Sequence, residues 1–165
     1  MSPSGHSIIK EHMFLNKALL AGELSCHFFF NDKYFGYDDG IYAMIRLFEI
    51  LSKTKKSLDS LLYGFPQKLS SPEFRIACNE DDKELIVKSV KKFFEEKNPQ
   101  EMITIDGVRA HMPYGWGLVR ASNTQPVICL RFESDTLDGL EKIKKDFFNA
   151  LSLSFNAEQL EKEIM

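Results

Sequence analysis

A cluster of hydrogen-bond donors lies in the middle of the stretch "GWGLVRASNTQPVICLRFES", residues 115–134. The donors fall between two apolar runs that the sequence predicts to be strands: Arg120, Ser122, Asn123 and Thr124. A hairpin turn does not need a guanidinium, an amide and two hydroxyls around one bend. A guanidinium matches phosphate geometry, the other donors can complete an anion nest, and Asn123 tolerates a left-handed backbone. The cluster therefore predicts a small-anion site, with a solvated polar turn as the open alternative.

A second polar loop, "GELSCH" at residues 22–27, also lies between two strand-like runs. A carboxylate, a hydroxyl and an imidazole suit the hydroxyls of a sugar, so Glu23, Ser25 and His27 are candidate sugar contacts. Glu23, Cys26 and His27 could also ligate a metal, but no second cluster completes a tetrahedral set, so we expect no metal site. A Ser25–His27 nucleophile pair is not expected either. On an extended segment both would point to one side, but no acid that would orient the histidine is identifiable.

The composition limits the function classes. The 165 residues are 44% hydrophobic and 27% charged with a net charge of -3, which is typical of a soluble globular protein. No apolar run approaches the roughly 20 residues of a membrane span, and lysines alternate with acids, so we expect neither membrane nor nucleic-acid binding. Three cysteines without paired spacing favour a cytoplasmic protein rather than a disulfide scaffold.

The first third of the chain must position the "GELSCH" loop. We expect a helix in "HSIIKEHMFLNK", strands in "ALLAGE" and "HFFFN", and a second helix capped by Asp38 or Asp39. The second helix has one apolar face, which we expect to pack against a sheet: Ile41, Met44, Ile45, Phe48 and Leu51. Two strands are too few for a covered sheet, so this third is predicted to be part of a larger α/β domain.

The rest of the chain must position the donor cluster. A polar segment at residues 53–74, with one Gly and two Pro, predicts a boundary between two units. Beyond it come a strand at 73–79, a helix at 81–96, further strand-like runs and a closing helix. A β-α-β-β-β-α order with a tight Asp106-Gly107 turn predicts an α+β domain, with a four-stranded antiparallel sheet and two helices on one face.

Several motifs together resemble one family. They are "GHS" at 5–7, "ALLAGELSCH" at 18–27, "YFGYDDGIYA" at 34–43, "SSPE" at 70–73 and "GWGLVRASNTQPV" at 115–127. In this order they resemble the α-D-phosphohexomutases, in particular the bacterial phosphomannomutase/phosphoglucomutase branch. Agreement of separate motifs in order is more specific than any one of them. The family interconverts hexose 1-phosphates and hexose 6-phosphates.

The resemblance implies a division of the chain. Residues 1–62 correspond to the C-terminal part of the family's third domain, a three-layer α/β domain. Residues 63–72 correspond to a hinge or linker, and residues 66–155 to the fourth, C-terminal domain, whose fold is TBP-like. Residues 156–165 are expected to be a tail.

The resemblance also implies roles for the two loops. The phosphate loop, defined as residues 120–124, would hold the substrate phosphate that is not being transferred, through Arg120, Ser122, Asn123 and Thr124. The sugar loop, defined as residues 22–27, would hold sugar hydroxyls through Glu23, Ser25 and His27. The "GHS" motif would place His6 beside the active site. Cys26 stands where the family usually has Gly, which bears on the local backbone.

Two family motifs do not occur in the 165 residues. The family transfers phosphoryl groups through a phosphoserine in a T-A-S-H-N type loop and a magnesium ion in a D-G-D-G-D-R type loop, and neither string is present. Magnesium and hexose 1,6-bisphosphate are the cofactors that the resemblance implies for the complete enzyme. We therefore expect no catalytic residue, metal or cofactor in this chain itself, and no activity of the chain alone.

The resulting expectation is a C-terminal fragment of a phosphohexomutase that binds mannose or glucose phosphates. It would need a chain that supplies the N-terminal domains. The alternatives are a non-catalytic sugar-phosphate binding module or complementing subunit, and a relic whose residues 1–62 fold poorly. The preferred hexose and the oligomeric state stay open.

Overall fold

The computed structural model describes residues 1–164, which form two compact units. The first unit ends at Pro66, the second begins at Gln67, and each has its own hydrophobic core. Among the described residues, no helix combines the length and the apolar character that crossing a membrane requires.

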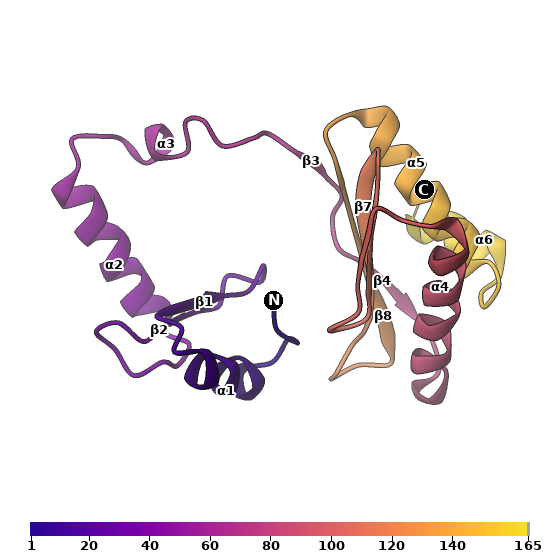
Figure 1. Cartoon of the computed structure of the whole chain (residues 1–165), viewed down its shortest axis with the longest axis horizontal. Helices are drawn as coiled ribbons and strands as arrows, with labels where there is room; N and C mark the ends of the chain where they lie inside the picture. Colours follow the sequence, from indigo (N-terminus) through magenta and orange to yellow (C-terminus); the bar gives the residue numbers. More distant parts are fainter. Residues whose placement is uncertain (165) are drawn as a thin grey trace. The chain divides into compact units, whose positions relative to one another are not determined.

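The first unit is built around a short hairpin (Figure 1). Its elements are α1 (His6–Asn16), β1 (Leu20–Gly22), β2 (Phe28–Phe30), α2 (Gly40–Lys53) and α3 (Leu58–Leu61). The antiparallel strands pair Ala21 with Phe29. Phe29 is fully buried, and it forms a small core with Ile9 and Met13 of α1. The two strands are shorter than the apolar runs that predicted them.

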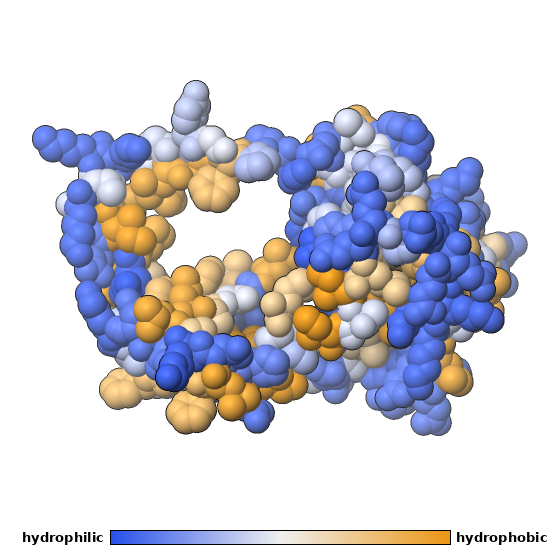
Figure 2. All heavy atoms as spheres, in the orientation of Figure 1, coloured by the Kyte–Doolittle hydropathy of each residue, from blue (hydrophilic) through white to orange (hydrophobic). Residues whose placement is uncertain are grey.

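The apolar face of α2 is exposed, so the prediction that it packs against a sheet was wrong. Asp39 caps the helix by accepting from the Tyr42 amide at 2.9 Å. No residue of α2 is buried, and Ile41 is 71% exposed. Figure 2 shows apolar side chains along one side of this helix and polar side chains along the other. A two-stranded hairpin is too narrow to cover the helix, which contacts β2 through the Tyr42 ring and the Arg46 guanidinium beside Phe30.

The second unit is an antiparallel sheet with its helices on one face (Figure 1). Its strands are β3 (Leu69–Ser70), β4 (Phe74–Ala77), β5 (Glu101–Ile103), β6 (Val108–Met112), β7 (Gly115–Ala121) and β8 (Val127–Ser134). Its helices are the 3₁₀ turn η1 (Glu80–Asp82), α4 (Lys83–Lys97), α5 (Leu137–Leu151) and α6 (Ala157–Ile164). The predicted α+β class with an antiparallel sheet is confirmed.

The sheet has six strands in place of the predicted four. Its order is β5-β6-β7-β8, and both β3 and β4 pair with β8, at different parts of its length. The short strands β3 and β5 have two and three residues, too few to show a clear alternation in the sequence. They extend the two edges of the sheet without changing its topology.

The core of this unit fills the space between the sheet and the helices. The Phe147 ring of α5 lies 4.5 Å from the Phe94 ring of α4 and 5.3 Å from the Phe132 ring of β8, between ring centroids. The segment expected to be a tail forms α6, whose Leu160 and Ile164 are buried in the same core. These two residues are one helical turn apart, so both reach one face.

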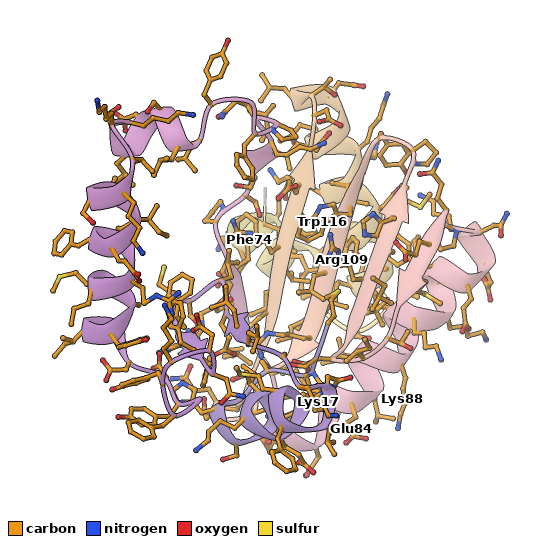
Figure 3. The ribbon with its side chains drawn as sticks, turned by 60° about the vertical axis from the view of Figure 1, so that its left-hand side comes forward. Lys17, Phe74, Glu84, Lys88, Arg109 and Trp116 are labelled. Carbon is orange, nitrogen blue, oxygen red and sulfur yellow. The ribbon has the colours of Figure 1, made fainter. Side chains whose placement is uncertain are left out.

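The face of the sheet opposite the helices carries charged side chains beside apolar ones. There the Arg109 guanidinium of β6 lies 4.0 Å from the Trp116 ring of β7 (Figure 3). The register pairs Arg109 with Leu118 and Arg120 with Cys129, so alternate residues of β6 and β7 point away from the core. This alternation brings Arg120 to the face opposite the helices, at the end of β7 where the phosphate loop begins.

Candidate functional site

The phosphate loop lies in the bend that connects the paired strands β7 and β8. Arg120 is the next-to-last residue of β7, and it is half-buried opposite Cys129. Ser122 is only 6% exposed, whereas Asn123 and Thr124 are exposed at the tip of the bend. The four residues predicted to bind an anion thus occupy one bend, at the start of a long strand.

Hydrogen bonds within the bend fix its backbone. The Ser122 amide donates to the Val127 carbonyl at 3.0 Å, and the Val127 amide donates to the Gln125 carbonyl at 2.8 Å. The Thr124 amide lies 3.4 Å from the Ser122 hydroxyl oxygen, which accepts from it and keeps its own hydrogen to donate elsewhere. The left-handed backbone that Asn123 could adopt is not used, because in the described residues the non-glycine residues with positive φ are Lys17, Cys26 and Asn98.

The Lys83 ammonium group braces the phosphate loop, and sequence reasoning missed it. Its side chain is 8% exposed, and its Nζ donates to the carbonyl oxygens of Ser122 at 2.6 Å and Gln125 at 3.2 Å. Glu80 forms an ion pair with it at 2.6 Å. A lysine at a helix start resembles any surface lysine, and nothing in the spacing links it to a loop almost 40 residues away.

Two further contacts hold the loop against β4 and the segment that follows it. The Arg75 guanidinium donates to the Gln125 side-chain oxygen at 2.6 Å, and the Cys78 amide donates to the Pro126 carbonyl at 3.0 Å. With Lys83 they attach both the backbone and a side chain of the bend to neighbouring elements. The exposed donors of Asn123 and Thr124 therefore project from a braced backbone.

The sugar loop is the turn of the β1-β2 hairpin. The Glu23 amide donates to the His27 carbonyl at 2.9 Å, and the Cys26 amide donates to the Glu23 carbonyl at 3.1 Å. Cys26 has φ 65°, a left-handed conformation in which a glycine avoids crowding of its Cβ. The segment is a tight turn and not an extended strand. The expectation that Ser25 and His27 point to the same side assumed an extended strand, so it does not apply. Ser25 is exposed in this turn.

Asp38 orients His27, and the expectation that no acid would do so was wrong. Its Oδ2 lies 2.7 Å from His27 Nδ1, and its Oδ1 accepts from the Phe28 amide at 3.1 Å. Because an ionised carboxylate only accepts, Nδ1 donates and the imidazole lone pair lies on Nε2. Asp39 alone caps α2. The sequence could not separate the roles of Asp38 and Asp39, because Asp38 reaches the hairpin only through its pairing with Phe29 in the folded chain.

His6, at the start of α1, completes this group. Its ring centroid lies 4.7 Å from that of His27 and 5.4 Å from that of Phe29, in edge-on contacts. One ligand atom from each of His6, Glu23 and His27 lies within 4.8 Å of the other two. Proximity of His6 to the sugar-loop side chains is therefore a property of the first unit alone.

Comparison with known proteins links both units to one family. The family model "Phosphoglucomutase/phosphomannomutase, alpha/beta/alpha domain III" matches residues 1–69, and "Phosphoglucomutase/phosphomannomutase, C-terminal domain" matches residues 73–150. A phosphomannomutase/phosphoglucomutase of Pseudomonas aeruginosa is 47% identical over 151 residues, which are 92% of this chain and 32% of that protein. A phosphoglucomutase of Neisseria meningitidis is 44% identical over 148 residues, 89% of this chain and 32% of that protein.

A solved structure gives the same result for the fold. A phosphoglucomutase/phosphomannomutase family protein from Burkholderia thailandensis matches with a TM-score of 0.81 and 37% identity, covering 96% of this chain and 32% of that one. The chain thus spans about a third of the length of these relatives.

Replacing Lys83 by methionine tests whether its ammonium group braces the phosphate loop. The substitution keeps an unbranched apolar side chain but leaves two loop carbonyls without their donor. We expect the free energy of unfolding of the second unit to fall by about 1–3 kcal/mol, and the loop amides to exchange hydrogen faster. Urea titration followed by fluorescence of Trp116, the single tryptophan, measures the first effect, and hydrogen exchange measures the second.

The matched control is Lys88→Met on the same helix. Lys88 is exposed and forms an ion pair with Glu84 at 3.3 Å (Figure 3). We expect a change within about 0.5 kcal/mol, because surface pairs contribute little. Equal stability and equal loop exchange in the two variants would contradict the bracing role of Lys83.

Replacing Asp38 by asparagine tests its control of the His27 tautomer. The Asn oxygen can still accept from the Phe28 amide, while its NH₂ group would donate to His27 Nδ1 and move the imidazole hydrogen to Nε2. Long-range ¹H–¹⁵N correlation spectra should show Nδ1–H in the native chain and Nε2–H in the variant. Asp59→Asn, in the first turn of α3, serves as control and should leave the spectrum unchanged. An Nε2–H tautomer in the native chain would refute the assignment.

Proposed function

Because the chain belongs to the phosphoglucomutase/phosphomannomutase family, we propose that it supplies substrate recognition in a phosphohexomutase that interconverts hexose 1-phosphates and hexose 6-phosphates. The phosphate loop would hold the phosphate that stays on the sugar, and the sugar loop would hold hydroxyls of the ring. The observation that carries the proposal is the braced bend of residues 120–124, which gathers a guanidinium, an amide and two hydroxyls.

Phosphate binding at this bend follows from donor chemistry. A guanidinium donates two parallel hydrogen bonds to phosphate oxygens, and these charge-assisted bonds are about twice as strong as neutral ones. The backbone is fixed before the ligand arrives, because the Lys83 ammonium group and the Cys78 amide already donate to its carbonyl oxygens. Less conformational entropy is then lost on binding.

Sugar recognition would come from hydrogen-bond acceptors. Glu23 offers a carboxylate, and His27 offers the Nε2 lone pair that Asp38 maintains by accepting from Nδ1. Both would accept from sugar hydroxyls, and Ser25 and His6 would add contacts. Acceptors of this kind recognise hydroxyls common to glucose and mannose, so we propose that the chain serves either sugar.

The magnesium ion of the family does not fit the residues present here. Mg²⁺ prefers an octahedral set of oxygen ligands. In the part of the chain that the structure describes, the one grouping of candidate ligands is two imidazoles and a single carboxylate. These residues would bind and orient the substrate, and the phosphoryl-transferring groups would come from a chain with the N-terminal domains.

A second candidate function is a non-catalytic sugar-phosphate binding module or a complementing subunit. This second function would use the same binding residues as the first. The two differ in whether turnover appears when a chain with the serine and metal loops is added. We place either form in the cytoplasm, because Cys26, Cys78 and Cys129 are all free thiols, as reducing conditions favour.

Assays of glucose 1-phosphate turnover distinguish these functions. We expect none from the 165-residue chain alone, since it contains no T-A-S-H-N or D-G-D-G-D-R string. We expect activity when the chain is mixed with a relative's N-terminal domains, if it is the substrate-recognition part of a mutase. Binding without any reconstituted turnover would support the binding module. Turnover by the chain alone would contradict both.

Replacing Arg120 by alanine tests the phosphate loop. We expect affinity for glucose 1-phosphate and mannose 1-phosphate to fall by about 10- to 100-fold, because hydrogen bonds to charged groups contribute roughly 1.5–3 kcal/mol. Titration followed by ³¹P NMR measures this weak binding. Lys142→Ala is the control, because Lys142 is an exposed cation of α5 that pairs with Asp138. If both variants bind as the native chain does, the phosphate assignment fails.

A further inference from the structure

Three side chains of the first unit that could act as metal ligands lie close together, and the family's magnesium chemistry does not use them. One ligand atom from each of His6, Glu23 and His27 lies within 4.8 Å of the other two. We propose that these three residues form a site for a divalent transition-metal ion, with Zn²⁺ as the best fit and Co²⁺ as its spectroscopic substitute. Two imidazoles and one carboxylate are ligands that Zn²⁺ prefers, and an open zinc site keeps its fourth position for water or a ligand.

The surroundings of His27 match those of a metal-binding histidine. Such a histidine usually donates its other ring N–H to a carboxylate, which fixes the tautomer and makes the ligating nitrogen more basic. Asp38 Oδ2 holds His27 Nδ1 at 2.7 Å in this way, and its Oδ1 is itself anchored by the Phe28 amide. The lone pair of His27 is therefore on Nε2 and does not depend on the metal for its position.

The other two ligands are also positioned by structure that exists without a metal. The Glu23 amide pairs with the His27 carbonyl at 2.9 Å, so the hairpin fixes these two residues relative to each other. The His6 ring contacts both the His27 ring and the buried Phe29 ring, edge to face. The side chains of His6 and His27 remain 54% and 41% exposed, so an ion can reach them and keep water on its remaining positions.

The sequence could not reveal this set. In the sequence, Glu23 and His27 stand beside Cys26, which makes the three of them the apparent ligand set. In the structure Cys26 is exposed in a left-handed turn, and the third member of the set is His6, which lies 17 residues before Glu23 along the chain. The packing of α1 on the hairpin, through Ile9, Met13 and Phe29, brings it there.

A metal ion at this site would block the sugar loop. Zn²⁺ would occupy the Glu23 carboxylate and the His27 lone pair, the same acceptors that we assign to sugar hydroxyls. Zinc should therefore compete with the hexose ring. This consequence rests on the proposed function, whereas binding of the metal itself does not.

Titration of the 165-residue chain with Co²⁺ tests the site. We expect one ion per chain, the visible d–d absorption of a low-coordinate nitrogen and oxygen site, and displacement by Zn²⁺. His6→Gln, Glu23→Gln and His27→Gln should each weaken binding at least 10-fold. Asp38→Asn, which changes no ligand, should weaken it by about 10- to 100-fold. Circular dichroism verifies that each variant is folded, and His6→Gln changes an exposed residue, so it keeps the test valid if another variant unfolds.

Two control variants separate this site from adventitious binding. His12→Gln removes a histidine of α1 outside the set, and Cys26→Ser removes the nearby thiol. Both should bind Co²⁺ as the native chain does. Absence of a one-to-one complex, equal affinity in His6→Gln, or loss of binding in Cys26→Ser would overturn the proposal. Zn²⁺ should also weaken binding of glucose 1-phosphate. If the Co²⁺ spectra are as expected but this competition is absent, the metal site stands and the sugar assignment fails.

Discussion

Strand β8 is the element on which the second unit depends. It pairs with β7 along one side and with both β3 and β4 along the other, and its inward residues Leu130 and Phe132 are buried in the core. The phosphate loop leads directly into this strand, so the position of the loop follows from the most heavily bonded element of the sheet. The buried Lys83 ammonium then fixes the backbone of the bend from the helical side. A binding loop on such a scaffold needs little ordering when its ligand arrives.

The first unit achieves local order with much less burial. Its core is Ile9, Met13 and Phe29, and α2 buries no residue. The sugar loop is nevertheless defined, because Asp38 bonds to both a side chain and a backbone amide of the hairpin. The Asp38 carboxylate fixes the sugar loop, whereas strand pairing fixes the phosphate loop in the second unit. The exposed apolar face of α2 shows how small the β1-β2 hairpin is: it is large enough to support the sugar loop but too small to cover a helix.

The sequence predicted what depends on local patterns. Apolar periodicity located α2 and α5, capping chemistry narrowed the cap of α2 to Asp38 or Asp39, and the density of donors marked the bend at residues 120–124. Residues whose roles depend on distant pairing were missed. Lys83 and Asp38 each have an ordinary local explanation, as a helical lysine and a helix cap, and only the folded chain brings them to a loop. Leu160 and Ile164 were missed because eight residues at the end of a chain give too short a pattern to separate a helix from a tail.

The two loops have opposite chemical character, and this explains both proposals. The phosphate loop presents donors and positive charge, because the Arg120 guanidinium accompanies the amide and hydroxyls. The sugar loop presents acceptors, because Glu23 is a carboxylate and Asp38 places the His27 lone pair on Nε2. A phosphorylated sugar carries both complementary kinds of group, an anion and hydroxyl donors. Acceptors that are arranged to receive hydroxyl hydrogens are equally arranged to receive a cation, since both present positive charge to a lone pair. Transition-metal binding is therefore a consequence of the same chemistry that would recognise the sugar.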